Sequence, residues 1–149
     1  MKLEEMVIDV EQQTEVNGAI EEVFKGVLYR FGAGNEAPNG ESLQLNLEPW
    51  AGGRWFRDRG NGVTHLWGHV QAIKPPVLLE LTGPLFMSYP ALNHVEVRLE
   101  ESAGGTRLRL RHRALGLLDG THRENVKSGW KKMVDNISSD FAGAPAPKI

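Results

Sequence analysis

The sequence predicts an α+β domain in which a strongly curved antiparallel sheet of six or seven strands wraps around a long C-terminal helix. Between residues 42 and 114, short runs of alternating apolar and polar side chains are separated by glycine and proline. This pattern is typical of strands with one covered and one wet face. Apolar residues at helical spacing precede this region, near 20–31, and follow it, near 122–141. A curved sheet held off by one long helix usually leaves an apolar cavity.

The bulk properties predict one domain over residues 1–142 and a flexible tail over residues 143–149. A formal net charge of −2 gives no global attraction for nucleic acid. The absence of cysteine excludes disulfides, thiolate nucleophiles and cysteine metal sites. Residues 1–6 lack the apolar core of a signal peptide, and no apolar run approaches the roughly 20 residues that span a bilayer. We therefore expect a cytoplasmic protein with no membrane span, either a monomer or a homodimer.

The N-terminal elements are a strand and a helix. Val7–Val16 reads as a strand because β-branched residues dominate its apolar set. Asn17 and Gly18 end the strand, and Asn17 is in position to cap the next helix. Apolar residues at helical spacing predict that this helix covers Ile20–Tyr29 and has one buried face. Gly32–Gly40 is a loop by composition.

The central region reads as about six strands and their turns. After the alternation at 43–47, the run Glu48–Phe56 turns through two glycines and enters an aromatic strand. Pro75 and Pro76 mark a strand boundary, since proline cannot donate to a ladder. Ala103–Gly105 is a hairpin turn between the last two strands.

The last element is predicted to start near Asp119 and to form a helix from about His122 to Phe141. Thr121 and Glu124 have the spacing of a capping box. Its apolar stripe consists of Val126, Trp130, Met133, Val134, Ile137 and Phe141. We expect Trp130, Met133 and Ile137 to face the sheet, with Gly129 either allowing close approach or making room there.

Several motifs, in this order, resemble the helix-grip superfamily of START-like and birch-pollen-allergen-like domains (SRPBCC). The branch that they resemble is named after the activator of the heat-shock-protein-90 ATPase, whose bacterial members are stand-alone domains. The motifs are the helix opening 16–24, the turn 48–55, the strand-Pro-Pro-strand unit 68–79, the hairpin 93–112 and the pair Gly129-Trp130. Family members often carry a tryptophan pair after the first helix, where this chain has the polar loop 32–40. The resemblance implies a helix-grip fold with a cavity, but it does not transfer a ligand preference.

Candidate cavity residues are aromatic or flexible apolar side chains near the gap between helix and sheet. They are Trp55, Trp67, Phe86, Met87, Tyr89, Trp130 and Met133, together with His112. The competing interpretation is that they only fill the core, since aromatics and methionines pack well. His112 shares the parity of Leu108 and Leu110, so it should point inward as a satisfied core residue or a polar anchor. In a roomy cavity, a leucine in its place should be tolerated.

Other chemistries find less support in the sequence. His65 and His69 share a strand face at i, i+4, about 13 Å apart, too far to chelate one metal. The arginine ladder at 107–113 faces Glu96 and Glu100 across a hairpin, so a charge-paired wet face is favoured over a nucleic-acid stripe. No nucleophile elbow or phosphate-binding loop is present.

We therefore predict a non-catalytic domain that binds a hydrophobic or lipid-like small molecule, with no catalytic residue, cofactor or metal. The first alternative is a cyclase or hydrolase-type enzyme that uses the same cavity. The resemblance adds a second alternative, a co-chaperone-like protein-interaction domain.

Overall fold

The computed structural model describes residues 2–143, so most of the predicted tail, 144–149, lies outside the described residues. The elements in chain order are η1 (Leu3–Met6), β1 (Val7–Val16), α1 (Ile20–Phe31), β2 (Leu45–Leu47), β3 (Arg54–Asp58), β4 (Thr64–Lys74), β5 (Leu78–Gly83), β6 (Ala91–Ser102), β7 (Gly105–Gly116) and α2 (Gly120–Asp140). One strand before the first helix and six after it match the sequence prediction.

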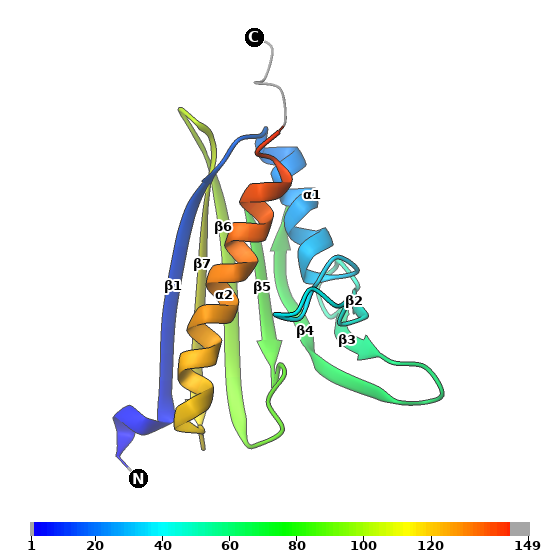
Figure 1. Cartoon of the computed structure of the whole chain (residues 1–149), viewed down its shortest axis with the longest axis vertical. Helices are drawn as coiled ribbons and strands as arrows, with labels where there is room; N and C mark the ends of the chain where they lie inside the picture. The colour runs from blue at the N-terminus through cyan, green and yellow to red at the C-terminus, as the bar shows by residue number, and fades with distance from the viewer. Residues whose placement is uncertain (1, 144–149) are drawn as a thin grey trace.

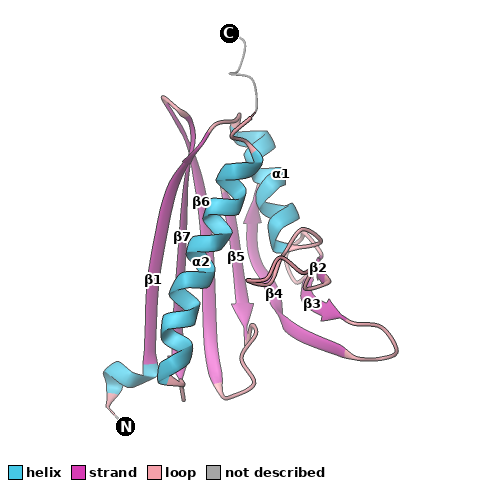
Figure 2. Cartoon of the chain, viewed as in Figure 1, coloured by secondary structure: helices cyan, strands magenta, loops and turns pink. Residues whose placement is uncertain are grey.

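All seven strands form one antiparallel sheet in the order β1-β7-β6-β5-β4-β3-β2. Both helices lie on the same side of this sheet (Figure 2). α2 runs along the sheet, and α1 lies beside its C-terminal half (Figure 1). This is the α+β architecture that the alternation and the two helical stripes predicted, and the helix-grip fold that the resemblance implied. Neither α1 nor α2, the two α-helices within residues 2–143, combines the length and apolarity needed to cross a bilayer.

The core lies between the helices and the sheet. The inward positions of β7, Leu108, Leu110 and His112, are fully buried. On α2, Val126, Trp130, Val134 and Ile137 are buried, so the predicted stripe does face the sheet. Met133 is half-buried at the edge of this stripe. The burial follows the two periodicities, two on the strands and 3.6 on the helix.

The outer face of the sheet is charged and paired. Arg107 hydrogen-bonds Glu15 at 2.9 Å and Glu100 at 3.2 Å, and Arg111 binds both carboxylate oxygens of Asp9. β7 lies between β1 and β6, and its arginines pair with Glu15, Glu11 and Asp9 of β1 and with Glu100 of β6. Such exposed pairs add little stability, but they match three of the four arginines of the ladder, Arg107, Arg109 and Arg111, with carboxylates.

The turn that the sequence singled out, 48–54, is closed by hydrogen bonds and by two glycines. Glu48 accepts from the Arg54 side chain at 2.8 and 3.0 Å and from its backbone N–H at 2.8 Å. The Arg54 side chain, followed by that backbone N–H, lowers the pKa of Glu48 to about 2. Gly52 has φ +83, and a Cβ on Gly53 would lie 2.0 Å from the Glu48 carbonyl oxygen, so neither position admits a side chain without strain.

Both predicted helix caps were wrong. α1 begins after Ala19 rather than under an Asn17 cap. α2 begins at Gly120, earlier than a Thr121 cap implies, because the Asp119 side chain accepts from the Thr121 N–H at 2.8 Å. An aspartate at this position satisfies one of the helix's unpaired N–H groups, as the predicted threonine would have done.

Candidate functional site

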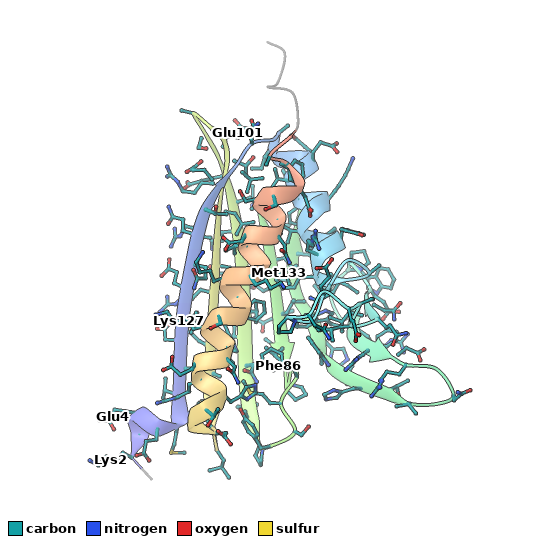
Figure 3. The ribbon with its side chains drawn as sticks, viewed as in Figure 1. Lys2, Glu4, Phe86, Glu101, Lys127 and Met133 are labelled. Atoms are coloured by element: carbon teal, nitrogen blue, oxygen red, sulfur yellow. The ribbon has the colours of Figure 1, made fainter. Side chains whose placement is uncertain are left out.

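A cavity of about 420 Å³ opens between α2, the loop after α1, and strands β3 and β4. Five of the predicted residues line it: Trp55, Trp67, Phe86, Trp130 and Met133. Figure 3 shows Met133 on α2 and Phe86 on the loop between β5 and β6. The lining also includes exposed residues of the rim, among them Glu36, Pro38 and Gly129, so the cavity is open to solvent on one side.

The deep wall is a continuous chain of aromatic rings. Trp55 lies 5.7 Å from Phe31 and 5.1 Å from Trp67 between ring centroids, and Trp67 lies 5.5 Å from Phe86. Phe31 also stacks on Trp130 at 6.0 Å. These separations are those of favourable aromatic pairs. The wall therefore presents a rigid apolar surface.

Each of the three indole N–H groups in this wall already has a partner in the protein. Trp55 donates to the Phe31 carbonyl oxygen at 2.6 Å, Trp67 to His65 Nδ1 at 3.2 Å and Trp130 to His112 Nδ1 at 2.9 Å. The tryptophans are therefore fixed in orientation and offer a ligand their ring surfaces rather than hydrogen bonds. Any polar recognition must come from other lining residues.

α2 contributes eight lining residues, which occupy one arc of the helix. They are His122, Asn125, Val126, Gly129, Trp130, Lys132, Met133 and Asn136. At 3.6 residues per turn they span about 160°. The apolar stripe supplies one edge of the arc and polar side chains the other, so the helix gives the cavity an apolar floor and a polar mouth.

The charged groups at the mouth come from α1, the loop after it, and α2. Arg30 binds both oxygens of Asp140, at 2.6 and 2.7 Å, and Glu36 at 3.3 Å. The hydrogen bond to Asp140 is the main reason why the pKa of Arg30 is raised. Arg30 Nη1 also donates to the Gly34 carbonyl oxygen, and Lys132 Nζ donates to that of Pro38 at 2.8 Å. These bonds tie the loop to both helices, and the charge of Arg30 is balanced.

Arg57 lines the cavity and was not predicted from the sequence. It differs from the other cations of the lining in having a buried nitrogen that is unpaired among the described residues. It lies two residues beyond Trp55 on β3 and lines the cavity. Its Nε atom is buried and has no hydrogen-bond partner among residues 2–143. The signal was available in the sequence, because residues two apart on a strand share a face and Trp55 was predicted to point inward.

His112 is buried as predicted, but it does not line the cavity. It lies behind Trp130, where Nδ1 accepts from the indole N–H and Nε2 donates to Asn93 Oδ1 at 2.7 Å. Both ring nitrogens are thus used within the core in the neutral Nε2–H form. Burial lowers the pKa of His112 to about 4. It is therefore a structural residue in this structure, and no ring nitrogen is free to act as a general base on a ligand.

The depressed pKa predicts that acid destabilises the protein. The unfolded chain binds a proton at His112 near pH 6.5, whereas the folded chain binds it only near pH 4. The stabilising contribution is therefore complete above pH 6.5 and is lost as the pH falls towards 4. We expect the free energy of unfolding, measured with urea, to fall by about 2 kcal/mol between pH 7 and pH 5 through this group. A His112→Gln variant should show a shallower dependence, and an equal dependence would contradict the assignment.

Met87 and Tyr89 also lie outside the cavity lining. Met87 is buried and accepts from Asn93 Nδ2 at 3.5 Å. The Tyr89 hydroxyl hydrogen-bonds His122 Nδ1, and the His122 ring lies 5.3 Å from that of Phe86. The apolar loop 84–90 is therefore packed against the core, with Leu85 fully buried. It supports the cavity wall through His122 and Phe86.

The family model described as "Activator of Hsp90 ATPase homolog 1-like protein" matches residues 39–141. The chain belongs to this family. The match begins in the loop at the cavity mouth and ends at the C-terminal end of α2, so it contains most of the lining of the cavity. Among curated proteins, none matches this member of the family significantly.

Solved structures confirm the fold of this Hsp90-ATPase-activator-like chain. CV1439 from Chromobacterium violaceum has a TM-score of 0.70 at 14% identity, with 89% of this chain and 96% of the other covered. SA2116 from Staphylococcus aureus, titled a protein of unknown function, has a TM-score of 0.65 at 15% identity over 91% and 94%. CalU16 from Micromonospora echinospora has a TM-score of 0.60 at 21% identity over 92% and 76%. At these identities the likeness shows the fold alone.

Among the described residues, the histidines of the sheet do not form a metal site in the cavity. The predicted common face of His65 and His69 was wrong, since Trp67 has no partner in β3 and this bulge breaks the alternation. His65 is half-buried against Trp67, and His69 is exposed. Within the described part of the chain, one group has metal-ligand proximity: Glu80, His94 and Glu96 on the other face of the sheet. There Arg98 hydrogen-bonds Glu96 at 2.6 Å, and His94 lies 3.5 Å from Glu80.

Proposed function

We propose that the protein is a binding domain for hydrophobic small molecules that lodge between α2 and the aromatic wall of the sheet. The observation that carries this proposal is the wall itself: four aromatic side chains, Trp55, Trp67, Phe86 and Trp130, line one open cavity, and the three indole N–H groups among them are already satisfied. Such a surface favours apolar contact, worth about 25 cal/mol per Å² of apolar area removed from water. Concave, mostly apolar pockets with a few polar groups are the usual form of small-molecule sites.

The enzyme alternative finds less support in the cavity. His112, the histidine predicted to point inward, lies behind Trp130 with both ring nitrogens engaged, and Glu36, the carboxylate in the lining, is paired with Arg30. An acid/base mechanism needs a group within hydrogen-bond reach of the reacting atoms. His122, the histidine in the lining, uses its Nδ1 for a hydrogen bond with the Tyr89 hydroxyl. We therefore favour binding without turnover.

A second candidate function, a co-chaperone-like interaction, is supported by the family description and by an exposed apolar cluster. Val7 and Leu92 both pair in register with Leu115. Their exposed fractions are 38%, 75% and 49%, on the face of the sheet away from the helices. A Leu92→Asp variant separates the two functions. If the parent stimulates an Hsp90-type ATPase and the Leu92→Asp variant does not, the interaction function is favoured. Binding of small molecules in the cavity should be the same in the variant and the parent.

Retention of apolar ligands tests the binding proposal. We expect native mass spectrometry, after incubation with a pool of apolar and amphipathic molecules, to show complexes of one ligand per chain. The same ligands should raise the unfolding temperature progressively with concentration, because they bind only the folded state. A pool of sugars of similar mass is the control and should give neither effect. If no member of the apolar pool is retained or stabilises the protein, the proposal is wrong.

A further inference from the structure

We infer, building on the proposed small-molecule function, that the cavity selects amphipathic carboxylates: the flat apolar body packs on the tryptophan wall and the carboxylate binds the Arg57 guanidinium. The inference names the ligand class that the proposed function leaves open. It rests on a comparison of partners: Arg57 lacks an ion-pair partner among the described residues, whereas the other charged groups of the same cavity have hydrogen-bond or ion-pair partners.

Arg57 is held in the wall by its strand. Its backbone pairs with Leu45 of β2 and His65 of β4, so it occupies an interior position of a three-stranded segment. Trp55, two residues before it, is almost fully buried on the same face. The guanidinium therefore stands next to the aromatic wall, in the position where the polar end of a ligand packed on Trp55 and Trp67 would lie.

No described residue neutralises this guanidinium. Arg57 forms no ion pair with any of residues 2–143, and its buried Nε makes no hydrogen bond there. Most buried polar groups in folded proteins have a hydrogen-bond partner, so an unpaired donor in a cavity wall is a candidate for recognising an acceptor. Arg57 is half-buried as a residue, and its buried Nε–H is a charged donor without a partner in the described part of the chain. A ligand that supplies an acceptor there gains a charge-assisted hydrogen bond.

The other cations of the lining are already committed. Arg30 is bound by two carboxylates, Asp140 and Glu36, and Lys132 donates to the Pro38 carbonyl oxygen. Glu36, the one carboxylate in the lining, faces Arg30 and does not pair with Arg57. The protein has a formal net charge of −2, yet its cavity wall contains a cation, Arg57, that no carboxylate of the lining pairs with.

The head group follows from the geometry of arginine. The Nε–H and one Nη–H form a planar fork that matches both oxygens of a carboxylate. A planar aromatic body matches the wall, in which ring pairs lie 5.1 to 6.0 Å apart. Aromatic carboxylates such as 2-naphthoate combine the two features, and 2-naphthamide is a neutral control of the same shape.

Calorimetric titration of both probes tests the inference. The parent should bind 2-naphthoate about tenfold or more tightly than 2-naphthamide, as expected for a charge-assisted hydrogen bond. Arg57→Met should weaken 2-naphthoate binding to the level of the amide and leave amide binding unchanged. Arg59→Met is the matched control, because it removes the same charge from an exposed position on the same β3–β4 hairpin. It should change neither affinity.

The fold of the variant is checked separately. Arg57→Met removes a buried unpaired donor, so its unfolding temperature should equal or exceed that of the parent. If it does not fold, Arg57→Lys keeps the charge but loses the fork, and it should reduce the preference for 2-naphthoate.

The outcomes are distinguishable. Equal binding of both probes by the parent, or no effect of Arg57 substitutions, overturns the carboxylate inference and leaves the binding function standing. If neither probe binds, the inference is wrong, and the apolar pool decides the proposed function by itself.

Discussion

A His112→Leu variant is expected to lose about 2 to 5 kcal/mol of stability in urea unfolding at pH 7. Leucine has a similar size but cannot replace the two hydrogen bonds of the imidazole. In the parent, His112 Nδ1 accepts from Trp130 Nε1 at 2.9 Å, and His112 Nε2 donates to Asn93 Oδ1 at 2.7 Å. Each buried polar group left without a partner costs about 1 to 3 kcal/mol. These hydrogen bonds reverse the expectation from the sequence that leucine is tolerated at this position.

A double-mutant cycle distinguishes lost hydrogen bonds from poor packing. Trp130→Phe removes the indole donor, so His112→Leu should cost less in that background, by about 1 kcal/mol or more. Equal costs in both backgrounds would show that the hydrogen bond between these two side chains contributes nothing, and the structural role assigned to His112 would be wrong.

A Gly129→Phe variant should weaken binding of apolar ligands by about tenfold or more while it retains the fold. A Cβ on Gly129 meets no atom within 4 Å, and the residue lies at the mouth of the cavity between Trp130 and Asn125. A phenyl group there fills space that a ligand needs, at a loss of the order of 1.4 kcal/mol per tenfold. Thermal shift and calorimetry with the retained ligands measure the effect.

Two variants control this experiment. Lys127→Phe adds the same ring two residues away, about 160° around the helix from Gly129, and should leave binding unchanged. Lys127 is exposed and lies away from Met133 (Figure 3). Gly129→Ala should bind ligand and gain up to about 1 kcal/mol of stability, since alanine is the better helix former. Unimpaired binding by Gly129→Phe would place the ligand elsewhere.

The sequence was sufficient for the elements whose signals are local. Val7–Val16 is a strand with those bounds, and the proline pair and the glycine turn separate strands as predicted. The faces of β4 were not predictable in the same way. The bulge at Trp67 changes the parity within the strand, and bulges follow from pairing with a neighbour rather than from the alternation itself.

The cavity was predictable in its apolar half only. Trp55, Trp67 and Trp130 lie on recognisable strand and helix patterns, and these patterns brought them together. The polar mouth depends on the loop after α1, which is held by contacts that are distant in sequence, such as Lys132 Nζ to the Pro38 carbonyl oxygen, 94 residues apart. Loop conformation of this kind is set by tertiary partners, and no periodicity records it.

The most direct test of a ligand-binding cavity with an Arg57 anchor is a crystal structure of the complex with 2-naphthoate. We predict electron density for the naphthyl ring between Trp67 and Trp130, with the carboxylate within hydrogen-bond distance of Arg57 Nε. A structure in which the cavity holds only water and the probe lies on the outer face of the sheet would contradict the account.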